Sequence, residues 1–112
     1  MLALLMTAGK MPELVVVRRE LFLNDCYSFI DCDFIETLNI RTKVGRALIV
    51  CDDSALIRDR IPEPSVALAD RGQFIFGKCL VFGYDPAHPD DPFTDVSKEI
   101  QSHFQNSPIL VV

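Results

Sequence analysis

The sequence predicts an α+β fold: a mostly antiparallel sheet of about five strands, a C-terminal helix packed on one face and a short second helix. Several short runs of β-branched and aromatic residues are separated by connections too short for repeated βαβ crossovers. Only two segments have helical periodicity, and residues 74–84 form one long apolar run typical of a strand buried on both faces. At 112 residues, the chain is expected to form a single domain over residues 1–112.

Four segments in the first half have strand character and are expected to form two hairpins. They are residues 2–7, 14–19, 34–40 and 46–52. A Gly-containing connection joins the first two, and a polar turn joins the last two. Residues 34–40 alternate between apolar and polar, except that Glu36 falls on the apolar side. Between the hairpins, Asn24 or Asp25 can cap a short helix over residues 24–30.

The second half contains less regular sequence around the apolar run. Residues 55–69 are expected to be irregular, with a short helical or extended piece, because Pro62 and Pro64 interrupt any helix. Residues 85–92 are predicted to form a rigid, proline-rich surface loop.

The last helix is predicted from a buried stripe and a capping residue. Val96, Ile100 and Phe104 are spaced as one helix face, and Thr94 or Asp95 can cap the helix start. The apolar tail, residues 109–112, is expected to pack or to pair as a strand.

The run at residues 74–84 is predicted to be the central strand, with two unequal faces. One face carries the aromatic residues and Lys78, and the other carries Gly77 and Gly83, which leave room for the last helix. The aromatic face is expected to be core under the sheet, with a ligand groove or a partner surface as the alternative. If no second layer covers it, we expect a second copy in a homodimer to do so.

Composition excludes some classes of function. Eleven Lys and Arg against sixteen Asp and Glu give a formal charge of −5, which argues against direct nucleic-acid binding through a basic surface. No apolar window approaches the roughly twenty residues of a membrane span, and residues 2–6 make a poor secretory signal, so we expect a cytoplasmic protein without membrane association. The four cysteines lie among apolar residues, as reduced buried thiols do.

The sequence contains few motifs typical of catalytic or metal sites, and we expect no cofactor, no metal and no catalytic residue. His88 lies near three aspartates, a ligand mix that divalent metals accept, but the intervening prolines favour a solvated acidic loop. Asp52 and Asp53 follow a strand, as catalytic carboxylates can, yet the next residue, Ser54, favours a tight turn. Arg58 and Arg60 are expected to pair with nearby acids within the chain.

Four segments resemble a family of small uncharacterised bacterial, phage and plasmid proteins, domain of unknown function 3846. They are the opening hairpin around AGKMPE, GRALIVCDD, FIFGKCLVFGY and the helix start FTDVSKEI. The resemblance covers roughly residues 2–104. It departs at Ser28-Phe29, where the family has a glycine pair, and at Ser65-Val66, where the family has Asn-Arg. It implies a mobile-element or phage setting but no reaction.

The leading hypothesis is a small non-enzymatic accessory protein that binds a protein partner, for example as an inhibitor of a host enzyme. An alternative is a small-molecule or nucleotide-binding module that uses Lys78, Arg58 and Arg60. A third is a hydrolase that uses Asp52, Asp53 and His88. The candidate binding residues for these hypotheses are the aromatic face and the acids that follow it: Phe74, Phe76, Lys78, Phe82, Tyr84, Asp90, Asp91 and Asp95.

Overall fold

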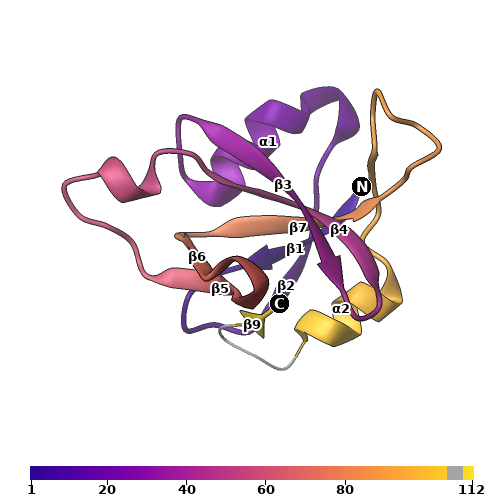
Figure 1. The fold of residues 1–112 in the computed structure, drawn as a ribbon. Helices are drawn as coiled ribbons and strands as arrows, with labels where there is room; N and C mark the ends of the chain where they lie inside the picture. Colours follow the sequence, from indigo (N-terminus) through magenta and orange to yellow (C-terminus); the bar gives the residue numbers. More distant parts are fainter. Residues whose placement is uncertain (106–109) are drawn as a thin grey trace.

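A computed structural model describes residues 1–105 and 110–112, and its largest element is a twisted antiparallel sheet (Figure 1). The strand order is β2-β1-β7-β4-β3, and a short sixth strand, β8, pairs with the end of β7. The strands are β1 (Leu2–Met6), β2 (Glu13–Val16), β3 (Ile35–Thr42), β4 (Gly45–Asp52), β7 (Cys79–Tyr84) and β8 (Phe93–Thr94). Both predicted hairpins, β1–β2 and β3–β4, are confirmed.

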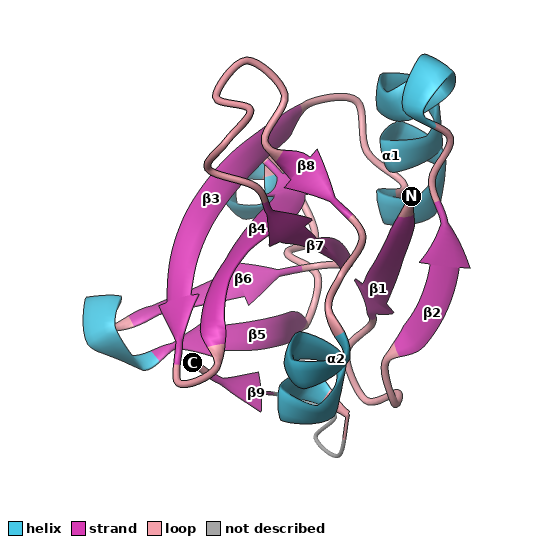
Figure 2. Ribbon diagram, turned by 90° about the vertical axis from the view of Figure 1, so that its right-hand side faces the viewer, coloured by secondary structure: helices cyan, strands magenta, loops and turns pink. Residues whose placement is uncertain are grey.

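A second, smaller sheet has the order β6-β5-β9, and its strands run across those of the large sheet (Figure 2). It consists of β5 (Pro64–Leu68), β6 (Gln73–Phe76) and β9 (Leu110–Val111). β5 pairs antiparallel with β6 and parallel with β9. The predicted pairing of the apolar tail is therefore confirmed for its last residues, whereas Ile109 lies outside the described residues.

The predicted central strand over residues 74–84 is wrong as a single strand. The chain leaves one sheet at Phe76 and enters the other at Cys79. Gly77 has φ +80°, a left-handed conformation that glycine adopts readily, and its N–H donates to the Glu63 carbonyl at 2.8 Å. Pro62 lies 3.3 Å from the position a Cβ on Gly77 would take. These contacts hold β6 against β5 and leave β7 alone in the centre of the large sheet.

The two faces of the large sheet are covered by different elements. On one face, α2 (Lys98–Phe104) and the small sheet enclose a core that includes Met6, Ile49 and Val81. On the other face, α1 (Phe22–Ile30) packs over Phe82. The C-terminal helix thus packs on one face of the sheet, as predicted.

The aromatic half of β7 is core rather than an uncovered surface. Phe82 is fully buried, and its ring centre lies 5.5 Å from that of Phe22 and 5.2 Å from that of Phe93. Tyr84 packs on the edge of the same core and is half-buried. α1 is therefore the second layer on this face of the sheet, and a second copy of the chain is not needed to cover Phe82.

The helix ends show which local signals were interpreted correctly. α1 ends at Asp31, which has the left-handed φ of 61° that closes a helix. α2 is capped by Ser97, whose hydroxyl accepts from the Ile100 N–H at 3.1 Å, so the predicted caps Thr94 and Asp95 are wrong. Asp95 instead accepts a hydrogen bond from the Leu2 N–H at 2.8 Å.

Neither of the helices in the described part of the chain has the length and apolar character needed to cross a membrane.

Three of the four thiols, those of Cys26, Cys51 and Cys79, are buried as predicted, and that of Cys32 is half-buried. Burial in apolar surroundings raises the pKa of each, to about 12 for Cys26 and Cys79, because the thiolate cannot be solvated there.

Candidate functional site

A cavity of about 580 Å³ lies at the end of the large sheet where the β5–β6 hairpin meets β3 and β4. We call this region the pocket end. Its walls come from β3, from the end of β4 and the turn after it, from the 3₁₀ segment Ala55–Ile57, and from the tip and second strand of the hairpin. The cavity exists because β6 departs from β7 at Gly77 and so leaves the ends of β3 and β4 uncovered.

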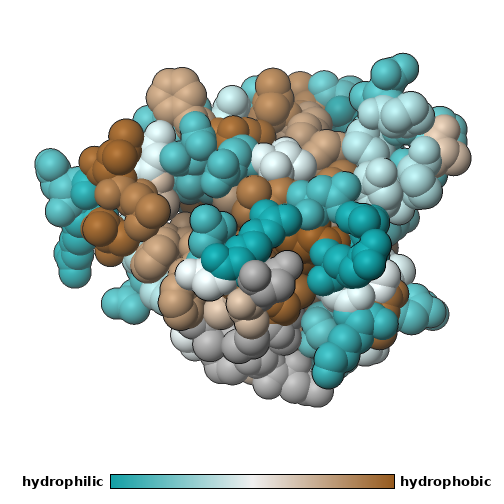
Figure 3. All heavy atoms as spheres, in the orientation of Figure 1, coloured by the Kyte–Doolittle hydropathy of each residue, from teal (hydrophilic) through white to brown (hydrophobic). Residues whose placement is uncertain are grey.

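One side of the cavity is apolar and unusually open to solvent. Phe74 and Phe76 point to the same side of β6, with ring centres 6.2 Å apart, and Phe74 is 53% exposed. Leu56, from the 3₁₀ segment, also lines the cavity and is 61% exposed, and Ile57, next to it in the sequence, is 84% exposed. Figure 3 shows strongly apolar surface on the segment that projects at the left of the molecule, which is the segment between β4 and β5 in Figure 1. Exposed apolar groups gathered around a cavity are typical of a binding surface.

The other side of the cavity is acidic. Asp52 is buried, forms an ion pair with Arg58 at 2.6 Å and accepts from the Ser54 N–H at 2.9 Å. The tight turn and the intramolecular pairing of Arg58 are thereby confirmed. Glu36 and Asp53 are exposed on the same wall, and neither has an ion-pair partner among the described residues. Glu36 and Asp53 therefore give the lining a negative charge that no ion pair offsets in the part of the chain that the structure describes.

A thiol also faces the cavity, but it is not poised to react. Cys51 donates a long contact, 3.7 Å, from its Sγ to the Glu36 carboxylate. Burial and the charge of Glu36 raise the pKa of the Cys51 thiol far above its ordinary value. Since the thiolate is the nucleophile, Cys51 is an inert part of the wall.

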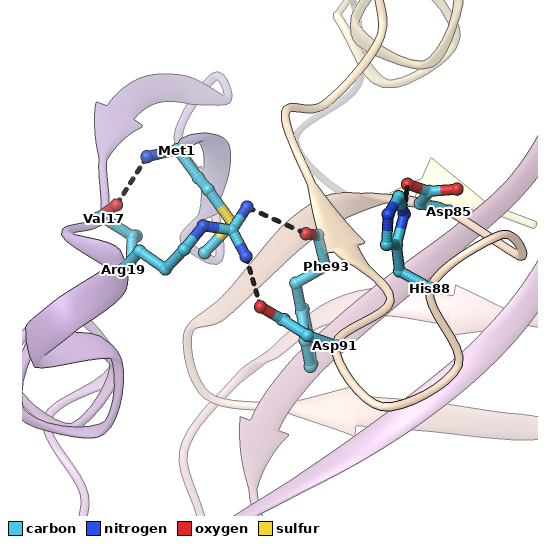
Figure 4. Close-up of polar contacts among 7 residues, drawn as sticks. All are labelled: Met1, Val17, Arg19, Asp85, His88, Asp91 and Phe93. Atoms are coloured by element: carbon cyan, nitrogen blue, oxygen red, sulfur yellow. Dashed lines mark hydrogen bonds and ion pairs between the residues drawn. The ribbon is translucent and has the colours of Figure 1, made fainter.

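The acids of residues 85–95 lie at the opposite end of β7, which we call the closed end. There Asp91 pairs with Arg19 at 2.5 Å, and Arg19 also donates to the Phe93 carbonyl at 3.2 Å (Figure 4). Asp85 contacts His88 Nδ1 at 2.7 Å, and this hydrogen bond, together with one from the Ala87 N–H, lowers the pKa of Asp85. Most of these carboxylates are thus engaged within the chain.

The candidate residues from the sequence are divided among three places. Phe74 and Phe76 line the cavity, whereas Phe82 is core and Tyr84 is at its edge. Lys78 is exposed beside the pocket end but does not line the cavity. Asp91 and Asp95 make the internal contacts described above, and Asp90 is exposed with no side-chain hydrogen bond or ion pair among the described residues.

The structure does not assemble the hydrolase site considered above. Cys51 pairs with Cys79 in the β4–β7 register, which places Asp52 and Asp53 at the start of β7. His88 lies beyond Tyr84, at its far end. Among residues 1–105 and 110–112, no three His, Cys, Asp or Glu side chains are grouped so that they could hold a metal ion.

Glu36 and Leu56 are among the lining residues that were absent from the sequence-based candidates. Glu36 left a signal, because it is an acid in the alternating pattern that places Leu38 and Ile40 on the core face. At that position the core ends and the cavity begins. Leu56 left no signal beyond its apolar character, because its role depends on how the 3₁₀ segment folds over the hairpin.

Comparison with protein-family models, with curated protein sequences and with solved structures finds no match to this chain.

Proposed function

We propose that this protein is a non-enzymatic accessory protein that binds a protein partner through the pocket end. The observation that carries this proposal is the cavity with Phe74 and Leu56 exposed in its lining, and with Ile57 exposed next to Leu56 in the sequence. We also propose that it works in the cytoplasm, which its four unpaired thiols support, and in the mobile-element or phage setting that the resemblance implies.

Exposure of large apolar side chains has a cost that a bound partner would remove. Burying such a side chain is worth about 1.5–3 kcal/mol, and both Phe74 and Ile57 are more than half exposed. An aromatic anchor beside a preformed cavity, surrounded by polar groups, is the usual arrangement of a binding hot spot. The pocket end combines these features at a single place.

The charge of the molecule favours a basic partner. The net charge of −5 and the carboxylates of Glu36 and Asp53 would accelerate association with a positively charged surface. Inhibition of a host enzyme by occupation of its basic cleft remains compatible with this charge. The pocket end supports such an interaction better than the loop after β7, because Asp91 and Asp95 already have partners within the chain.

Affinity capture with the double variant Phe74→Ser/Ile57→Ser tests the proposal. Proteins from a host lysate are quantified by mass spectrometry on immobilised wild type, on the double variant and on the control Leu23→Ser. Leu23 is as exposed as Phe74, at 53%, but lies on α1. We expect at least one protein to be lost from the double variant and retained by the control. Identical capture by all three would refute binding at the pocket end.

A small ligand is a second candidate, because a volume of about 580 Å³ is in the range of ligand sites. In the described part of the chain, no Lys or Arg side chain lines the cavity, and Arg58 is engaged by Asp52. This lining disfavours nucleotides. A thermal-shift panel of nucleotides and of amine metabolites distinguishes the classes, because only a ligand that binds the folded state raises Tm.

A further inference from the structure

We infer that the cavity at the pocket end selects a cationic group on an apolar stem, namely an arginine or lysine side chain presented by a partner protein. This inference rests on the proposed function, because it names the chemistry of the partner at the same site. It is drawn from the apolar and the acidic residues that line the cavity and from the charges around them.

The apolar wall suits the stem of such a side chain. Phe74 and Phe76 present neighbouring rings, and Leu56 adds an apolar side chain from the 3₁₀ segment. Long basic side chains bury their methylene groups along surfaces of this kind and keep the charged head in polar surroundings. A guanidinium group also stacks favourably on an aromatic face.

The acidic wall suits the charged head. Glu36 lies in β3 and Asp53 in the turn after β4, so two neighbouring segments each supply one exposed carboxylate to the lining of the cavity. A charge-assisted hydrogen bond is about twice as strong as a neutral one. Two carboxylates at the rim can therefore distinguish a cation from a neutral group of the same shape.

The neighbouring cations do not cancel this charge. Arg58 is taken by the buried Asp52, and Arg71, at the tip of the hairpin, donates to the Asn39 carbonyl at 3.1 Å. Lys78 is exposed but does not line the cavity. A phosphate or carboxylate would therefore meet two negative charges with no cation in the lining, whereas an ammonium or guanidinium group would neutralise them.

Two capped tripeptides test the inference: acetyl-Leu-Arg-Leu-amide and its citrulline analogue. Citrulline replaces the guanidinium by a neutral urea of nearly the same shape. Each is titrated by NMR into the ¹⁵N-labelled full chain, at low and at high salt. We expect the arginine peptide to bind about tenfold more tightly, as loss of one charged hydrogen bond implies, and to shift amides of β3 and β6. The advantage should shrink at high salt.

The double variant Glu36→Gln/Asp53→Asn should lose the preference for arginine. Its matched control is Asp90→Asn/Glu99→Gln, which removes the same charge from exposed acids elsewhere and should keep the preference. Thermal unfolding of both variants checks that each remains folded.

The inference is overturned if the two peptides bind equally, if the pocket variant keeps the preference, or if the arginine peptide does not saturate at millimolar concentration. Its failure differs from failure of the proposed function. If capture of a protein depends on Phe74 and Ile57 while the two peptides bind equally well, protein binding is supported and the preference for a cation is refuted. If the preference for arginine is observed while capture is unchanged in Phe74→Ser/Ile57→Ser, the proposal of protein binding at this site is refuted.

Discussion

The two ends of β7 use the same kinds of residue for opposite purposes. At the closed end, Phe82 is enclosed by other rings, and Asp91 and Asp95 bind groups of the same chain. At the pocket end, Phe74 is exposed, and Asp53 has no ion-pair partner among the described residues. Aromatic and acidic residues thus stabilise the fold at one end and remain available at the other.

The difference arises from which elements reach each end. The closed end is covered by the start of α1 and by β8, and Gly83 lies so close to Asp95 that a Cβ would meet its carbonyl oxygen. The pocket end is left open because β6 turns away at Gly77. Residue type alone therefore does not decide whether a side chain is enclosed within the fold; the elements that cover it do.

The largest expected effect comes from breaking the closed end. Phe82→Ala should lower the free energy of unfolding by about 3–5 kcal/mol, because Phe82 is fully buried and the cavity cannot collapse between two other rings. Phe74→Ala, at the pocket end, should stay within about 0.5 kcal/mol of wild type. Urea unfolding followed by circular dichroism measures both. Equal losses would show that the two ends are not distinct.

The two ends should also differ in their tolerance of a methyl group. A Cβ on Gly83 would lie 2.3 Å from the Asp95 carbonyl oxygen, so Gly83→Ala should cost about 1–3 kcal/mol. Gly72 lines the cavity with open space around it, and Gly72→Ala should cost about 1 kcal/mol through its φ of +60° alone. Unfolding midpoints in urea provide the comparison. A milder effect at Gly83 than at Gly72 would contradict the close packing of the closed end.

Acid should weaken the closed end through Asp25. Two hydrogen bonds from the Arg18 side chain, at 2.7 and 3.1 Å, and one from its backbone N–H lower the pKa of Asp25 from 3.8 to about 2. Because the folded-state pKa lies below that of the unfolded chain, the stabilisation is complete above about pH 4 and is lost as the pH falls through about 2. Asp25→Asn should lower Tm at pH 6, and its difference from wild type should shrink towards pH 2. A difference that stays constant with pH would count against this ion pair.

The smallest effects are expected from the exposed acids. Asp91→Asn removes an ion pair whose side chains are both more than half exposed, so it should cost at most about 1 kcal/mol and less at high salt. Asp53→Asn removes no ion pair and should not destabilise the protein. Paired thermal unfolding at low and high salt tests this. Destabilisation by Asp53→Asn would reveal an internal role that the contacts do not show.

Local patterns predicted the elements well because their causes are local. The β1–β2 and β3–β4 hairpins follow from alternation and turn residues, and α1 and α2 follow from helical spacing. The break at Gly77 could not be predicted, because a glycine in an apolar run is compatible with a continuous strand. What fixes its left-handed conformation is a hydrogen bond from its N–H to Glu63, fourteen residues away by sequence number (77 − 63).

The site was predicted only in part for the same reason. Phe74 and Phe76 were candidates because they are aromatic, and they do line the cavity. Asp91 and Asp95 were candidates as acids, and the structure engages both within the chain, because sequence shows a carboxylate but not whether Arg19 or the Leu2 N–H will reach it from a distant segment. In the sequence, Glu36 could be recognised as an acid at an apolar position of the alternating pattern. That it lines a cavity depends on where the β5–β6 hairpin lies.

The two residues between β6 and β7 have a mechanical consequence. Gly77 and Lys78 are the whole link between a wall of the cavity and the central strand of the large sheet. A short link transmits displacement that a long loop would absorb. Binding in the cavity should therefore also stabilise β7. Slower hydrogen exchange of the β7 amides would then report that the cavity is occupied.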